Sequence, residues 1–107
     1  HSFPAKPLPY ELHPNQARPE LCIGADGFHT PEQLIESISS NWPGSVVVNQ
    51  PFSGSYVPLE WFGTERRVGS VMLEIRRDVI DAWISDPRPA PESALVDAVA
   101  GVIDSGI

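Results

Sequence analysis

The residue best suited to chemistry is Glu74, which stands in the middle of an apolar strand pattern. The stretch 71–78 reads Val-Met-Leu-Glu-Ile-Arg-Arg-Asp. Successive side chains of a strand point to opposite faces, so one face is apolar and the other carries Glu74 and Arg76. A buried, unpaired carboxylate is costly, so we expect Glu74 to meet a cation, a metal ion or a water-filled cleft. The alternative is a solvent-facing strand on which Glu74 pairs with Arg76 or Arg77.

The histidines come next, because a neutral imidazole is a good metal ligand. They stand at positions 1, 13 and 29. Their proline-rich spacing offers no helical i, i+4 pair, so we do not expect the three to form a metal site by themselves. His29 precedes a predicted helix start, where a structural hydrogen bond is the expected role. Cys22, the single cysteine, is expected to be a buried core thiol.

A predicted strand and a predicted helix should help to position these groups. Segment 21–24 (Leu-Cys-Ile-Gly) is a short apolar run that ends at glycine, which predicts a buried strand. Thr30-Pro31 predicts a helix start, with the threonine hydroxyl as the cap and proline at the first helical position. The helix ends at Pro43-Gly44. Its apolar stripe consists of Leu34, Ile35, Ile38 and Trp42.

Further stretches complete the predicted sheet and its cover. Segment 46–48 is a run of three valines, typical of a strand buried on both faces. A loop at 49–56 follows, then a strand at 70–76 and a proline-rich link at 86–91. A last helix of about a dozen residues faces the core with Leu95, Val96, Val99, Val102 and Ile103. This order predicts an α/β fold with a mixed central sheet that is flanked by helices and covered on both faces.

The composition restricts the partners. The chain has 107 residues and a net charge of -7, a balance that argues against nucleic acid and anionic membranes. A single cysteine allows no intrachain disulfide, and neither a signal peptide nor a long apolar run is evident. We therefore expect a cytoplasmic protein. The chain opens on His-Ser-Phe-Pro rather than on methionine, and we expect it to be part of a longer protein.

Four blocks of sequence, taken in order, resemble the N-formylglutamate amidohydrolase family. They are Leu-Cys-Ile-Gly (21–24) with Phe-His-Thr-Pro (28–31), Asn-Gln-Pro-Phe-Ser-Gly (49–54), Arg-Val (67–68) and Met-Leu-Glu-Ile-Arg-Arg-Asp (72–78). From residue 79 the chain departs from the family pattern. The resemblance implies a zinc-carboxypeptidase-like (phosphorylase/hydrolase-like) fold. It also implies that residues 1–107 are one partial domain, the C-terminal half, with a proline-rich loop at 1–19 and an α/β core at 20–107.

The resemblance also implies roles for individual residues. His1, followed by Ser2, is similar to the pair that supplies one zinc ligand, and Glu74 is similar to the catalytic glutamate, a general base and then a general acid. The remaining zinc ligands belong to an earlier segment, so the partner would be a missing N-terminal half or another chain. Without the resemblance, His1 would be interpreted as a disordered terminal residue.

Three residues are predicted to contact the substrate. Arg76 shares a strand face with Glu74 and could orient it or bind a substrate carboxylate; an ion pair with Asp78 or Glu74 is the alternative. Tyr56 is similar in order to the loop tyrosine of the carboxypeptidases, and the alternative is a phenol packed on its loop. Asn49 could reach the substrate or cap the end of its strand.

The implied activity is zinc-dependent hydrolysis of the amide bond of an N-acyl amino acid. N-formyl-L-glutamate, cleaved to formate and L-glutamate in histidine breakdown, is the expected substrate. Two alternatives stay open. One is a peptidase or deacylase that acts on another amide, and the other is a non-catalytic binding or scaffold domain that keeps the fold. We expect the 107 residues alone to be inactive.

Overall fold

A mixed sheet forms the centre of the structure. The computed structural model describes residues 1–86 and 91–104, and within them the strand order is β1-β4-β2-β3. The strands are β1 (Ser2–Phe3), β2 (Leu21–Gly24), β3 (Val46–Val48) and β4 (Met72–Arg76). β1 is parallel to β4 and β3 is parallel to β2, whereas β2 and β4 are antiparallel. The predicted mixed sheet is therefore confirmed.

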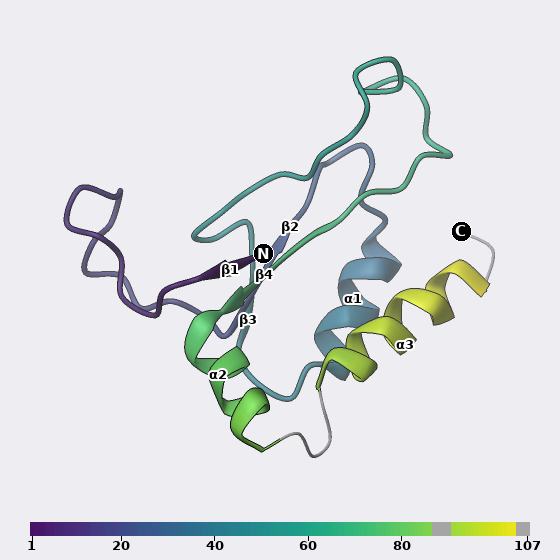
Figure 1. The fold of residues 1–107 in the computed structure, drawn as a ribbon. Coiled ribbons are helices and arrows are strands. Elements are labelled where there is room, and N and C mark those ends of the chain that lie inside the picture. Colours follow the sequence, from purple (N-terminus) through teal and green to yellow (C-terminus); the bar gives the residue numbers. More distant parts are fainter. Residues whose placement is uncertain (87–90, 105–107) are drawn as a thin grey trace.

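The helices cover one face of this sheet (Figure 1). They are α1 (Glu32–Asn41), α2 (Arg77–Ser85) and α3 (Pro91–Asp104). One hydrophobic cluster joins β2, α1 and α3, and its buried members are Leu21, Ile23, Leu34, Ile38, Trp42, Leu95, Ala98 and Val102. α2 packs against the same cluster through Val79 and Trp83. Loops cover the second face, where the Phe52 carbonyl meets Cys22 of β2, so the described sheet is covered on both faces, with its helices on one of them.

The start of α1 differs from the predicted cap. The helix begins at Glu32 after an extended Pro31, and no side chain caps it. The Thr30 hydroxyl is already engaged, since it accepts the Asp26 N–H at 2.8 Å and donates to the Ser70 carbonyl at 2.6 Å. Thr30 therefore ties the turn after β2 to the segment before β4. The apolar stripe of the helix is confirmed, with three of its four residues buried, namely Leu34, Ile38 and Trp42.

β3 is less buried than its three valines predict. Val47 and Val48 are 37% and 39% exposed, because β3 stands at the end of the described sheet with β2 as its neighbour there. A β-branched run signals a strand but does not say whether a further strand lies beside it. The prediction of burial on both faces is wrong for the described residues.

The C-terminal third contains one helix that the sequence predicted and one that it did not. α3 buries Leu95 and Val102 as predicted, but Val96 is 66% exposed and faces away from the core. α2 follows β4 without a loop and was missed. The predicted link at 86–91 falls mostly on residues 87–90, outside the described residues, as does the side chain of Ile103. No helix within the described residues is long and apolar enough to cross a membrane.

Candidate functional site

The loop-covered face of the sheet carries Glu74. Glu74 pairs with Cys22 across the antiparallel strands β4 and β2, so the two side chains share a face. β1 adds to this face, because Phe3 is in register with Arg76, two residues beyond Glu74. By alternation, Leu73 and Ile75 point to the other face, where they pack against the helical core. The alternation predicted for this strand is thus confirmed.

Glu74 lies against His1. Its Oε1 is 3.0 Å from the Nδ1 of His1, although 73 positions separate the two residues. Two backbone hydrogen bonds hold the first residue beside β4: the His1 nitrogen donates to the Leu73 carbonyl at 3.0 Å, and the Ile75 N–H donates to the His1 carbonyl at 3.0 Å. The parallel pairing of β1 with β4 therefore brings the imidazole to the carboxylate.

The two partners differ in exposure. Glu74 is 7% exposed, whereas the His1 side chain is 84% exposed. A buried carboxylate beside an accessible imidazole can exchange protons with a molecule bound at the surface. The alternative pairing of Glu74 with Arg76 or Arg77 is not observed, because Arg76 binds Asp78 and Arg77 Nε lies 3.4 Å from the Ser2 hydroxyl. Glu74 therefore meets an imidazole rather than a guanidinium.

Cys22 is the cross-strand neighbour of Glu74 on this face. It is fully buried, and its Sγ donates to the Phe52 carbonyl at 3.2 Å. Burial raises the pKa of the Cys22 thiol above its ordinary value, and the nearby Glu74 carboxylate adds to that rise. The thiol therefore stays protonated and unreactive, which confirms the predicted core role.

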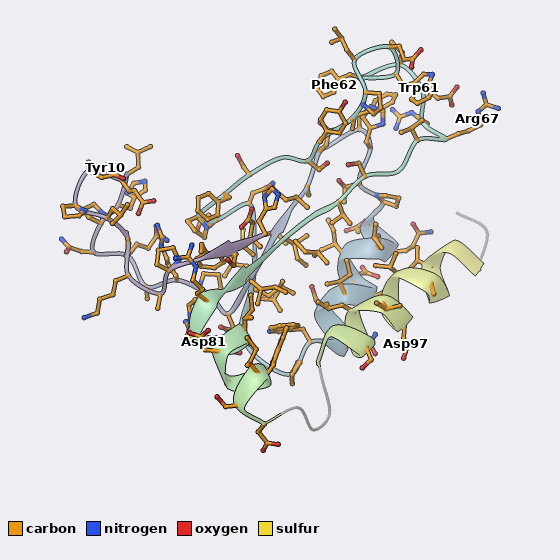
Figure 2. All side chains as sticks on the ribbon, viewed as in Figure 1. Tyr10, Trp61, Phe62, Arg67, Asp81 and Asp97 are labelled. Carbon is orange, nitrogen blue, oxygen red and sulfur yellow. The ribbon has the colours of Figure 1, made fainter. Side chains whose placement is uncertain are left out.

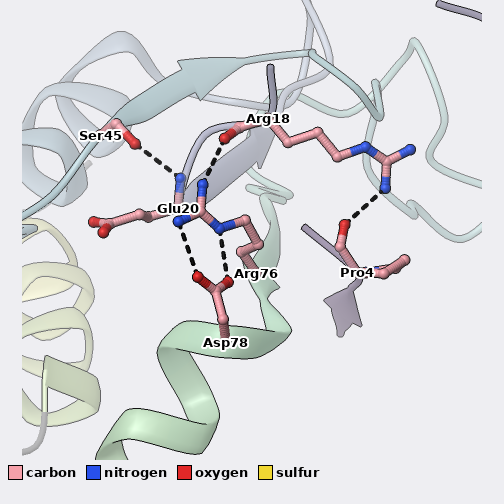
Figure 3. A network of polar contacts seen from close by, with 6 residues as sticks. All are labelled: Pro4, Arg18, Glu20, Ser45, Arg76 and Asp78. Atoms are coloured by element: carbon pink, nitrogen blue, oxygen red, sulfur yellow. Dashed lines mark hydrogen bonds and ion pairs between the residues drawn. The ribbon is translucent and has the colours of Figure 1, made fainter. Parts of the chain in front are cut away.

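Arg76 takes part in an ion-pair network rather than in an open cleft (Figure 3). Its Nε and Nη2 bind the two oxygens of Asp78 at 2.7 and 3.0 Å, and its Nη1 donates to the Arg18 carbonyl at 2.7 Å. Hydrogen bonds to Asp78 raise the pKa of Arg76, and those same bonds lower the pKa of Asp78. The Asp78 pair that the sequence left as an alternative is the contact observed.

Arg18 is a charged residue of this face that the sequence did not single out. It is 8% exposed, and its guanidinium lies 5.6 Å from the Phe3 ring centre and 5.7 Å from that of Phe52. Nη2 binds Glu11 at 2.8 Å and Nη1 donates to the Pro4 carbonyl at 3.0 Å. Arg18 thereby fastens the proline-rich loop over β1. The proline-rich segment around Arg18 has no apolar periodicity, so the sequence did not predict that this side chain is buried.

Asn49 and Tyr56 occupy different environments. The Asn49 backbone has a φ of 61°, and its Oδ1 accepts the N–H groups of Ala25 at 2.8 Å and of Gly54 at 3.1 Å. This amide organises the loop after β3, in line with the capping alternative. Tyr56 is 84% exposed, and its carbonyl accepts the Ser70 hydroxyl at 2.6 Å. The Tyr56 phenol is therefore accessible, whereas the Asn49 side-chain oxygen is already bound to two backbone N–H groups.

His29 has a structural role, as the sequence predicted. It is 2% exposed, its Nδ1 lies 2.8 Å from the Val68 carbonyl, and its Nε2 accepts the Gly63 N–H at 2.9 Å. This pattern requires the neutral tautomer with hydrogen on Nδ1. His29 fixes the base of the long loop that joins β3 to β4. Trp61 and Phe62 project from the outer part of this loop (Figure 2).

A pocket of about 540 Å³ opens on the same face, toward the β3 edge. Val47, which is in register with Cys22, lines it together with Arg18 and Asn49. The other lining residues come from the loops on either side, namely Leu12, His13, Gln16, Ala17, Pro19, Gln50 and Pro51. Polar groups of two loops thus border the face that holds Glu74.

The metal-binding capacity of this face is limited. Among the described residues, no three His, Cys, Asp or Glu side chains come together as a metal site would need. His1 presents an exposed imidazole whose second ring nitrogen, Nε2, points away from the Glu74 contact at Nδ1. It could supply a single ligand, and the others would have to come from elsewhere.

Comparison with known proteins identifies one relationship. The family model described as N-formylglutamate amidohydrolase matches residues 1–80, which include β1, β2, β4 and the His1–Glu74 contact. No curated protein and no solved structure matched the chain. The match ends within α2, so α3 lies beyond it.

Proposed function

The chain belongs to the N-formylglutamate amidohydrolase family, and we propose that it takes part in hydrolysing the amide bond of an N-acyl amino acid. The proposed substrate is N-formyl-L-glutamate, which reacts with one water molecule to give formate and L-glutamate. The observation that carries the proposal is the 3.0 Å contact between His1 and Glu74, two residues from opposite ends of the matched region.

Glu74 is the proposed proton carrier. As a carboxylate, it takes a proton from the water that attacks the formyl carbon, and it then gives this proton to the departing amine nitrogen. Its burial supports this role, because contacts on the sheet face hold its side chain in place and limit competing water. The exposed imidazole of His1 connects the buried carboxylate of Glu74 to molecules at the surface.

Zinc is the proposed cofactor, with His1 as one of its ligands. When bound, zinc would polarise the substrate carbonyl and make water more acidic. The described residues fit this role only in part, since they contribute one accessible imidazole and no cluster of three ligands. We therefore propose that further ligands come from additional chain, either of the same polypeptide or of a partner.

No strand of the described residues pairs with the outer edge of β3, and this supports an association with additional chain. An edge strand presents unpaired N–H and C=O groups, and Val47 and Val48 are more than one-third exposed beside them. A strand added beside β3 would cover both valines. The exposed phenol of Tyr56 is proposed to contact the substrate, whereas Arg76 is proposed to position β4 through Asp78 and Arg18.

Substitution of Glu74 by glutamine tests the proposed role in the natural-length polypeptide that carries these residues. Glutamine keeps the shape of the side chain but cannot take up a proton, so kcat for N-formyl-L-glutamate should fall by about three orders of magnitude. Zinc content, measured by atomic absorption, should not change, because Glu74 is not a proposed ligand. Glu36→Gln, on the exposed surface of α1, is the matched control and should keep wild-type activity.

Two results would count against the proposal. Activity of the Glu74→Gln enzyme within about tenfold of wild type would remove Glu74 from proton transfer. The wild-type enzyme could also hydrolyse other N-acyl amino acids but not N-formyl-L-glutamate. That result would keep the assignment as an amide hydrolase and would show that the proposed substrate is wrong.

A further inference from the structure

A second pocket lies on the helix-covered side of the sheet, away from Glu74. Its volume is about 500 Å³, within the range of small-molecule sites. Its apolar wall consists of Pro31, Leu34 of α1, Val71 before β4, and Val99 and Val102 of α3. Leu34 and Val102 are buried members of the helical core, so the pocket is a continuation of that core to the surface.

Two arginines from the loop before β4 border this apolar wall. Arg67 is paired, since its Nε and Nη2 each bind an oxygen of Glu65 at 2.9 Å. Arg66 forms no ion pair within the described residues, and its guanidinium lies 4.1 Å from the centre of the Phe28 ring. The net charge of the chain is -7, so a cation without an ion-pair partner among the described residues gives this pocket a local positive charge on an acidic molecule.

We propose that this pocket binds a medium-chain aliphatic carboxylate. The alkyl chain packs between Leu34, Val99 and Val102, and the carboxylate meets the guanidinium of Arg66. The wall favours an alkyl chain, because its apolar lining among the described residues is aliphatic. The charge of Arg66 selects the anionic head, since a guanidinium is matched to a carboxylate in shape and charge.

This site is separate from the proposed hydrolytic site. Val99 and Val102 come from α3, which lies beyond the residues matched by the family model. Leu34 packs on the sheet face opposite to Glu74, whose partners are His1 and Cys22. Binding here therefore does not require the amide hydrolysis proposed above, and loss of one function leaves the other intact.

Isothermal titration of the natural-length polypeptide with octanoate tests the proposal. We expect saturable binding at one site, with affinity that rises by about fourfold for each methylene added from hexanoate to octanoate. 1-Octanol, with the same chain and no charge, and acetate, with the same head and no chain, should each bind much more weakly. Octanol that binds as tightly as octanoate would overturn the role of Arg66.

Two variants locate the site. Arg66→Gln should weaken octanoate binding by about fivefold, the effect of one partly exposed charged contact. Arg77→Gln removes the same charge from an exposed position outside the pocket and should bind like wild type. Val99→Trp fills the pocket with Arg66 in place, and it should also weaken octanoate binding. Equal binding by wild type and Val99→Trp, or equal losses in the two arginine variants, would refute this site.

Discussion

The two faces of the sheet are built from the same strands but are stabilised differently. On one face, Leu21 and Ile23 of β2 are fully buried under α1 and α3. On the other face, Cys22 between them is equally buried, but its cover is loop backbone, with the Phe52 carbonyl 3.2 Å from its sulfur. Packing against helices holds the first face together, whereas the second combines the aromatic contact of Phe3 with Phe52 and polar contacts between distant segments.

This difference separates stability from chemistry. The helix-covered face contains no buried charged side chain among the described core residues, whereas the loop-covered face buries both Glu74 and Arg18. Buried charges contribute little net stability, because desolvation offsets their attraction. On this face Arg18 holds the proline-rich loop over β1, and Glu74 is the residue proposed for proton transfer. The comparison therefore predicts that changes on the first face alter folding and that changes at Glu74 alter activity.

The largest stability effect should come from the helix-covered face. Ile38 of α1 is fully buried in the core cluster, and Ile38→Ala should lower the free energy of unfolding by about 2–5 kcal/mol, because it leaves a cavity. Cys22→Ala, at an equally buried position on the other face, removes a single sulfur and should cost about 1 kcal/mol. Urea denaturation followed by circular dichroism measures both values. An equal loss of unfolding free energy in the two variants would show that the two faces contribute to stability in the same way.

A smaller effect of opposite sign is expected for Glu74→Leu. The change removes a buried carboxylate and adds apolar contacts, so the free energy of unfolding should stay the same or rise by about 1 kcal/mol while activity is lost. The same denaturation experiment provides the measurement, with Glu74→Gln for comparison. Destabilisation comparable to that of Ile38→Ala would show that Glu74 is a structural residue.

The smallest effect concerns the ion pair at the end of β4. Hydrogen bonds from Arg76 hold the pKa of Asp78 below its ordinary 3.8 in the folded protein. The folded state therefore binds fewer protons, so this contribution is complete above pH 3.8 and disappears as the pH falls through the lowered folded-state value. Asp78 is about half exposed, and after screening by solvent the contribution should not exceed about 1 kcal/mol.

Asp78→Asn should remove that contribution. The stability difference between wild type and the variant should be constant near neutral pH and should shrink as the pH is lowered below about 4. Denaturation midpoints measured from pH 7 to pH 2 give this curve. A difference that grows on acidification would contradict the direction of the Asp78 shift.

The sequence predicted the parts of the fold that depend on local periodicity. The alternation at 71–76 predicted β4, and the apolar run at 21–24 predicted β2. The stripe of Leu34, Ile38 and Trp42 predicted α1. α2 was missed although Val79 and Trp83 have helical spacing, because it follows β4 with no turn signal between them. β3 was misjudged because exposure at a sheet edge depends on neighbouring chain and not on the strand itself.

The candidate site was predictable to a different extent. That Glu74 needs a partner followed from the cost of burying a carboxylate, but the identity of the partner did not. Nothing local to Ser2–Phe3 signals a strand, since these two residues form one only by pairing with β4 residues 73 positions away. Family resemblance, not periodicity, pointed to His1. The burial of Arg18 had no local signal at all.

Anomalous diffraction at the zinc edge, from crystals of the natural-length polypeptide soaked in zinc, tests the central claim most directly. The claim is that His1 and Glu74 meet at one hydrolytic centre on the loop-covered face. It predicts an anomalous peak at the His1 imidazole, on the same side of the sheet as Glu74, and loss of this peak in His1→Ala but not in Glu74→Gln. A zinc ion bound on the helix-covered face, or one that stays in place when the imidazole is removed, would contradict the account.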